Sequence, residues 1–136
     1  MISILDLFGN FFDCDDATDE VKANAQDFLD NVLNPLLIEA EAHGIDLKIN
    51  PRTKTYVSGE QYGGFRPQSC PIGAPHSAHK LGLACDVYDP DGALDAYLTD
   101  AILAAHGAYR EAPSATPGWA HITSRAPASG HRTFMP

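Results

Sequence analysis

Apolar residues recur every three or four positions between Thr18 and His43, which is the spacing of one buried helix face. Thr18 and the acidic residues after it suit a helix start, and Gly44 suits its end. Pro35 lies inside the pattern and should kink the helix or divide it in two, because proline has no backbone N–H to donate. The pattern therefore predicts a long amphipathic helix that is interrupted near Pro35.

The rest of the chain alternates short strand-like runs with turns. Strands are predicted at 45–49, 54–58, 83–88 and 119–123 and through 132–134, with a second helix at about 94–108. A long loop rich in glycine and proline, 59–75, is the predicted place of a substrate cleft. Together the elements predict an α+β fold, with helices packed on one face of a small, mainly antiparallel sheet.

Three residues on two predicted strands and the loop before one of them are candidate metal ligands. Successive side chains of a strand point to opposite faces, so Asp86 projects from one face of 83–88 and His121 from one face of 119–123. His79 lies in the loop that leads into the first of these strands. Two imidazoles and one carboxylate form the ligand set of a catalytic zinc site, which leaves a fourth position for water. On spacing alone, histidines with ordinary hydrogen-bonded partners remain the alternative.

Four motifs follow one another along the chain. They are Gly-Gly-Phe-Arg-Pro at 63–67, Gly-Ala-Pro-His-Ser-Ala-His at 73–79, Gly-Leu-Ala-Cys-Asp at 82–86 and Gly-Trp-Ala-His at 118–121. Over about residues 33–136 the chain resembles the zinc D-Ala-D-Ala carboxypeptidase family of peptidoglycan metallopeptidases. That family includes vancomycin-resistance dipeptidases and phage endolysins, and its pattern reads Ser-Gly-Tyr-Arg, Ser-x-His-x-x-Gly-x-Ala-x-Asp and then Trp-x-His or His-x-His.

The resemblance implies a role for each matching residue. It implies that His79, Asp86 and His121 bind Zn²⁺, on the face of the sheet away from the helices. It also implies that Arg66 binds the substrate and the charge that develops in the transition state, and that Ser77 contacts the substrate.

Two positions depart from the family pattern. The Ser-Gly-Tyr-Arg motif reads Gly-Gly-Phe-Arg at 63–66, which is a mild change. Many members carry an acidic general base three residues before the last zinc histidine, where this chain has Gly118, and others carry a histidine two residues before it, where this chain has Trp119. Trp119 is a candidate for lining the substrate pocket, and a buried aromatic residue at a strand start is the alternative.

The general base must therefore come from elsewhere in the chain. Glu111 is the best candidate, because the loop 113–118 would fold it back beside His121. An exposed carboxylate at the end of a helix is the alternative for Glu111. His76 and His131 are weaker candidates for the base.

Composition limits the other classes of function. A chain of 136 residues predicts one domain, 1–136, with 1–16 as an N-terminal extension. The net charge of −9 argues against nucleic acid, which proteins bind through clustered lysine and arginine. No apolar run approaches the roughly 20 residues of a membrane span, and the start lacks the basic residues of a signal peptide. Three widely spaced cysteines suit free thiols, although pairing of Cys70 with Cys85 stays open.

Together these observations predict a zinc metallopeptidase that cleaves peptidoglycan stem peptides, either as a carboxypeptidase or as an endopeptidase. The expected protein is a monomeric, phage or prophage lysin-like enzyme without a nucleic-acid or membrane partner. It would be made in the cytoplasm and act on the cell wall after release or as part of a phage particle. Two alternatives stay open: a non-hydrolytic zinc domain of the same fold, as in the hedgehog signalling domain, and a structural component of the virion or tail.

Overall fold

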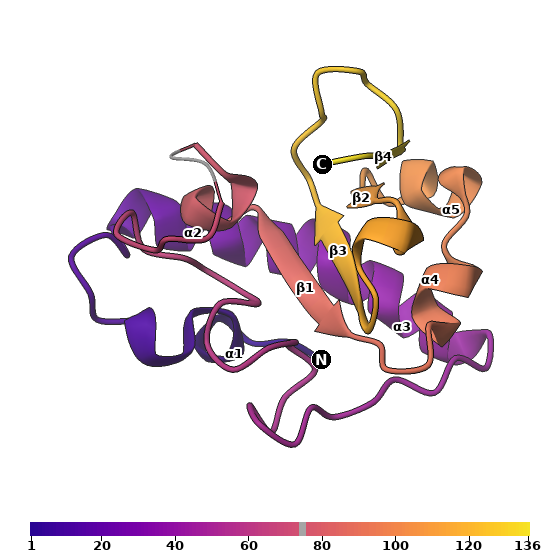
Figure 1. Ribbon diagram of the computed structural model, residues 1–136, viewed down its shortest axis with the longest axis horizontal. Coiled ribbons are helices and arrows are strands. Elements are labelled where there is room, and N and C mark those ends of the chain that lie inside the picture. The colour runs from indigo at the N-terminus through magenta and orange to yellow at the C-terminus, as the bar shows by residue number, and fades with distance from the viewer. Residues whose placement is uncertain (74–75) are drawn as a thin grey trace.

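The computed structural model describes residues 1–73 and 76–136, so the Ala-Pro dipeptide within the second motif, at the end of the predicted cleft loop, lies outside the described residues. The described chain has the predicted α+β class, with helices and a small open sheet (Figure 1). Its elements are, in order, α1 (Ile4–Phe8), the 3₁₀ turn η1 (Gly9–Phe11), α2 (Asp19–Phe28), the π-helical turn η2 (Leu29–Leu33), α3 (Asn34–Ala42), the 3₁₀ turn η3 (Ala78–Leu81), β1 (Ala84–Tyr88), α4 (Ala93–Tyr97), α5 (Asp100–Ala105), β2 (Tyr109–Glu111), the 3₁₀ turn η4 (Pro113–Ala115), β3 (Trp119–Thr123) and β4 (Thr133–Phe134).

The predicted long helix is formed by α2, η2 and α3, which follow one another without a break. Thr18 caps its start by accepting a hydrogen bond from the backbone N–H of Val21 at 3.2 Å. Pro35 does not divide the helix, because the turn before it is π-helical and the N–H of Asn34 bonds to the carbonyl of Leu29. The predicted interruption is thus a local change of helix type. Within residues 1–73 and 76–136, no helix has both the length and the apolar character that crossing a bilayer requires.

The sheet has the strand order β1-β3-β2-β4 and is mixed rather than uniformly antiparallel. β3 pairs antiparallel with β1 and with β2, whereas β2 and β4 run parallel. Figure 1 shows α2 and α3 crossing behind β1 and β3, while α4 and α5 lie beside the sheet. The prediction that the helices cover one face therefore holds for the long helix and not for the short ones.

The strand predicted at 45–49 is wrong. This segment runs without strand pairing and leaves Ile49 half exposed. Of the strand predicted at 54–58, only single bridges form, from Thr55 to Asn50 and from Val57 to Val87. The outer edge of β1 is thereby occupied by the segment around Val57.

The helix predicted at 94–108 is also wrong in its extent. It ends at Tyr97, and a new helix starts at Asp100, because the Thr99 side chain caps the N–H of Ile102 at 3.2 Å. The chain then enters β2 at Tyr109, where the prediction had only a helix end.

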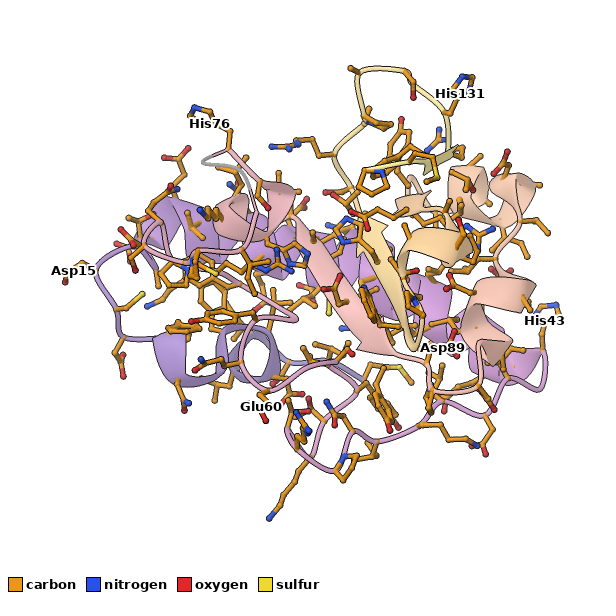
Figure 2. All side chains as sticks on the ribbon, in the orientation of Figure 1. Asp15, His43, Glu60, His76, Asp89 and His131 are labelled. Atoms are coloured by element: carbon orange, nitrogen blue, oxygen red, sulfur yellow. The ribbon has the colours of Figure 1, made fainter. Side chains whose placement is uncertain are left out.

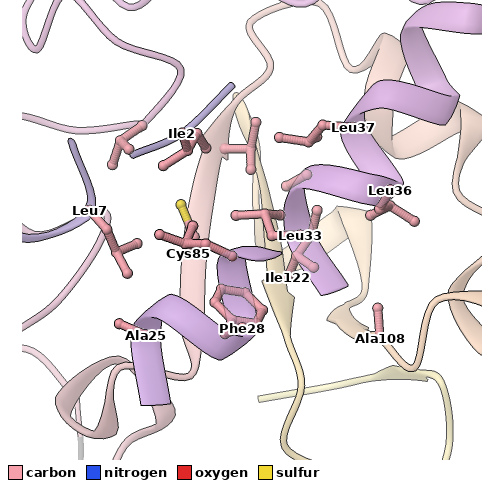
Figure 3. Close-up of a cluster of buried hydrophobic side chains, with 14 of the residues drawn as sticks. Ile2, Leu7, Ala25, Phe28, Leu33, Leu36, Leu37, Cys85, Ala108 and Ile122 are labelled. Carbon is pink, nitrogen blue, oxygen red and sulfur yellow. The ribbon is translucent and has the colours of Figure 1, made fainter. Parts of the chain in front are cut away.

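The core lies between the long helix and the back of the sheet (Figure 3). The first residues of the chain belong to it, because Phe8 of α1 stacks on Phe65 with ring centroids 4.7 Å apart. Figure 3 shows leucines of α3 and η2 facing strand residues of the sheet. The buried members from these elements include Phe28, Leu29, Leu33, Leu36, Leu37, Cys85, Val87, Ala120 and Ile122.

This core predicts a contrast between two residues of the long helix. Replacing fully buried Leu33 with alanine should lower the free energy of unfolding by about 2–5 kcal/mol, because the cavity cannot fully collapse. Ile38→Ala removes a side chain that is 56% exposed and should change it by less than about 1 kcal/mol. Urea denaturation of both variants measures the difference. Equal effects would contradict the described packing of the helix.

Candidate functional site

His79, Asp86 and His121 converge at one point; strand alternation predicted this for Asp86 and His121, and the family motifs implied it for His79. The Nδ1 atom of His121 lies 2.9 Å from Asp86 Oδ1 and 3.2 Å from His79 Nε2. The third side of this triangle, from His79 Nε2 to Asp86 Oδ1, measures 3.4 Å. All three residues are buried, and their potential ligand atoms form a cluster that can hold a metal ion.

Asp86 and His121 meet because β1 and β3 pair in a register that places them directly opposite each other. On both strands the flanking residues point the other way. Cys85 pairs with Ile122 on the core side, and both are fully buried there. A register shift of one residue would put the polar pair into the core and the apolar pair into the site.

His79 is held by the short turn η3 rather than by a strand. The Ser77 hydroxyl caps this turn by accepting from the N–H of His79 at 3.3 Å. Gly82 ends the turn with φ of +75°, and a Cβ there would lie 2.7 Å from the carbonyl oxygen of Val21 in α2. Glycine at this position therefore lets the His79 turn pack directly against the long helix.

The ring of His79 has a fixed tautomer. Its Nδ1 lies 2.8 Å from the carbonyl oxygen of Gly64, and a carbonyl can only accept, so Nδ1 carries the proton. Nε2 is then the ring nitrogen that faces Asp86 and His121. Gly64 has no room for a side chain, because a Cβ would lie 2.0 Å from the carbonyl oxygen of Leu7. A backbone carbonyl that orients a histidine in this way is typical of the surroundings of metal sites.

Asp86 is ionised despite its burial. Burial alone raises the pKa of its carboxyl, but the neighbouring His79 and His121 outweigh that effect and lower the pKa. The Arg66 guanidinium lies on the other oxygen, with Nη2 3.3 Å from Oδ2. The cluster therefore presents a carboxylate and two imidazoles to one point.

A cavity of about 680 Å³ opens onto this cluster. Its walls include the other four residues singled out in the sequence: Arg66, Ser77, Glu111 and Trp119. The two weaker candidates for a general base, His76 and His131, are not among its lining residues. Figure 2 shows both at the periphery of the molecule.

Glu111 lies beside His121, as the loop 113–118 predicted, but on a strand that the sequence did not predict. It belongs to β2, which pairs with β3 so that Arg110 lies opposite Ile122 and Glu111 comes next to His121. Its Oε1 atom lies 4.0 Å from His121 Nε2, whereas the other ring nitrogen, Nδ1, makes the contacts with Asp86 and His79. The loop 113–118 thus folds the chain back as predicted, and the antiparallel pairing of the two strands that it joins holds the carboxylate beside His121.

The sequence did not indicate the wall formed by the C-terminal segment. Phe134 of β4 lies edge-on to the ring of His121, with centroids 6.3 Å apart, and Arg125 and Met135 line the same cavity. Thr123 lines it too and shares a strand face with His121, so the alternation used for His121 would have found it. The strand predicted through 132–134 is confirmed as β4, but the place of Phe134 in the site depends on parallel pairing with a strand more than twenty residues earlier, which no local pattern indicates.

The cysteines take no part in the cluster. All three thiols are free, which leaves Cys70 and Cys85 unpaired. Burial raises the pKa of the Cys85 thiol well above its usual range, so it stays protonated in the core.

Comparison of the chain with protein-family models, with curated proteins and with solved structures finds no significant match in any of the three. The resemblance to zinc D-Ala-D-Ala carboxypeptidases thus rests on the quoted motifs alone.

A buried ion pair fixes the strand that carries Glu111. Arg110 of β2 donates to the backbone carbonyl of Asp95 at 2.6 Å and lies 3.3 Å from its carboxylate. The same carboxylate accepts from Thr116, in the loop before β3, at 3.4 Å. Burial raises the pKa of Asp95 to about 6; Arg110 opposes this rise and the nearby Asp89 adds to it.

The raised pKa of Asp95 predicts a pH-dependent stability. The folded state binds this proton more tightly than the unfolded state, so stability should fall as pH rises from about 4 to about 7. The loss attributable to Asp95 is at most about 3 kcal/mol, since one pKa unit is worth about 1.4 kcal/mol. Urea denaturation across this range should show a smaller decline for Asp95→Asn than for the wild type. Parallel curves for the two proteins would contradict the assignment.

Proposed function

We propose that this chain is a zinc-dependent peptidase that cleaves the stem peptides of peptidoglycan, in the manner of a phage or prophage lysin. The observation that carries the proposal is the buried triangle of His79, Asp86 and His121 at the floor of a cavity that Glu111 also lines. The family motifs support the same reading, because each of their functional positions lines this one cavity or lies at its floor.

The dimensions of the triangle suit zinc. Bonds of about 2.0–2.1 Å in tetrahedral geometry place neighbouring ligand atoms about 3.3 Å apart. The three distances in the cluster, 2.9, 3.2 and 3.4 Å, lie around this value. Two histidines and one carboxylate also match the ligand types of catalytic zinc, and the cavity gives access to a fourth position. When bound, Zn²⁺ would supply Lewis-acid polarisation of the scissile carbonyl and a water of lowered pKa.

The side chains that line the cavity would then take part in hydrolysis of the peptide bond. A carboxylate oxygen of Glu111 would take a proton from the attacking water and return it to the leaving amine nitrogen. Arg66 donates through Nε to the carbonyl of Tyr62 and through Nη2 to Asp86; among the described residues its Nη1 has no partner. That group is free to donate to the oxyanion of the substrate. Ser77 and Trp119 would orient the peptide from the cavity wall.

A second candidate is a non-hydrolytic zinc domain of the same fold. It is favoured by one observation: Glu111 lies beside the Nε2 atom of His121, where a carboxylate orients a metal-binding ring without transferring a proton. The two candidates differ in what the loss of Glu111 would change, which is metal affinity for the positioning role and turnover for the catalytic one.

The metal site predicts one zinc ion per chain. Asp86→Ala should weaken zinc binding by at least about 100-fold, more than the effect usual for residues that only orient the ligands. Saturating zinc should also raise the melting temperature of the wild type, because it binds the folded state alone. Elemental analysis after gel filtration and thermal denaturation measure the two effects. Asp46→Ala, which replaces an exposed aspartate, is the matched control and should retain zinc.

The proposed activity predicts a mass loss in peptidoglycan. Zinc-loaded protein should shorten stem peptides, detected by mass spectrometry of the products, and Asp86→Ala should leave them intact. Glu111→Gln should lower kcat by about 100-fold or more while keeping zinc, because general acid–base catalysis usually contributes that much.

Two outcomes would count against the proposed hydrolytic activity or the proposed role of Glu111 in it. Intact peptides from several wall types, in the presence of zinc-loaded wild type, would favour the non-hydrolytic domain. Full turnover by Glu111→Gln with a 10- to 100-fold weaker zinc affinity would assign Glu111 a positioning role.

A further inference from the structure

Two cavities meet at the His79–Asp86–His121 cluster. The larger one, about 680 Å³, has walls from β3, β2 and the C-terminal segment. The smaller one, about 380 Å³, is formed mainly by the segment 58–63 together with Ile72. Arg66, Asp86 and Trp119 line both cavities, so the two are continuous at the cluster.

The sheet places these cavities on opposite sides of the cluster. The segment that forms the smaller cavity pairs with the outer edge of β1, where the N–H of Ser58 donates to the carbonyl of Asp86 at 2.8 Å. The strands β3, β2 and β4 follow on the other edge of β1, and their residues Glu111 and Phe134 line the larger cavity. In Figure 1 the C-terminal loop and the segment 58–63 accordingly lie on different sides of the sheet.

The chemistry of the two sides differs. In the smaller cavity Arg52 is already paired with Glu60 at 2.7 Å, and Ile72 presents an apolar side chain that is 49% exposed. The other cation in the described lining of this cavity is Arg66, and the proposed reaction uses its Nη1 group at the oxyanion. A terminal carboxylate, which needs a cation for tight binding, would therefore have to compete for that group. The larger cavity has Arg125 on its rim, which suits the acidic side chains of a stem peptide.

We propose that the two cavities form one groove that binds a peptide on both sides of the scissile bond, so that the chain is an endopeptidase for cross-linked stem peptides. This inference rests on the proposed function. Each cavity lies within the 300–1,000 Å³ usual for a ligand site, so each can hold a part of the substrate. In the reaction, water adds across the amide: the carbonyl carbon gains the hydroxyl, the amine nitrogen gains the proton, and both products keep several residues.

The test compares purified cross-linked muropeptide dimers with uncross-linked monomers. Zinc-loaded protein should split the dimers into two peptide fragments, identified by mass spectrometry. Binding is measured separately with zinc-loaded Glu111→Gln, through the fluorescence of Trp119, the single tryptophan of the chain, which lines both cavities. Dimers should bind at least about tenfold more tightly than monomers, since they bury more apolar surface.

A matched pair of variants tests the smaller cavity. Ile72→Ser should weaken dimer binding about fivefold, because the isoleucine would be covered by the peptide. Ile49→Ser is the control, since this isoleucine is 52% exposed and lines none of the three cavities described by the structure. Its dimer affinity should match that of the parent protein.

The outcomes separate this inference from the proposed function. Release of single terminal residues from monomers, with dimers left intact, would overturn the endopeptidase while keeping the peptidase. Equal binding of dimers and monomers, or equal effects of the two isoleucine variants, would overturn the two-sided groove. No product from any muropeptide would overturn the peptidase itself.

Discussion

Asp86 and His121 face each other because β1 and β3 pair in one antiparallel register. The same register seals the back of the two strands against the long helix, where Cys85 and Ile122 are fully buried. The free energy gained by burying that apolar face fixes the register, since a slip of one residue would exchange the two faces. The packing of the core thus fixes the position of Asp86 and His121, which point to the opposite face of the two strands.

The cluster itself adds no obvious stability. A buried carboxylate with two imidazoles must be desolvated, and the attraction within such a group often only offsets that cost. Here the cost is reduced by Arg66 on one carboxylate oxygen and by the Gly64 carbonyl on the outer nitrogen of His79. Every buried side-chain nitrogen and oxygen among the described residues has a hydrogen-bond partner. With these contacts in place, the three inward-facing atoms of His79, Asp86 and His121 form a group that could hold a metal ion.

The parts of this site that sequence reasoning predicts are those fixed by local pattern. Alternation along two short strands was enough to bring Asp86 and His121 to one face, and the turn between Ser77 and Gly82 was enough to bring His79 to them. Glu111 was predicted correctly as a neighbour of His121, because the loop 113–118 joins β2 and β3 as a hairpin, whereas its three-residue strand is too short to give a pattern of its own. Such a strand exists only through its partners on both edges and through the Arg110–Asp95 pair. The segment 45–49 shows the converse, since its strand-like residues pair with no strand.

The strand order arranges the functional groups in a line across the sheet. From the segment beside β1 the line runs through Asp86 to His121, then to Glu111, and Phe134 pairs with Glu111 at the far edge. Neighbouring strands lie about 4.8 Å apart, so these groups span the width of several peptide units. A substrate laid along this line would meet the ligand cluster at its middle and have protein surface on both sides. For the proposed endopeptidase, a longer loop at 58–63 or a longer C-terminal segment would close one end of this line, and cleavage would then be restricted to terminal residues.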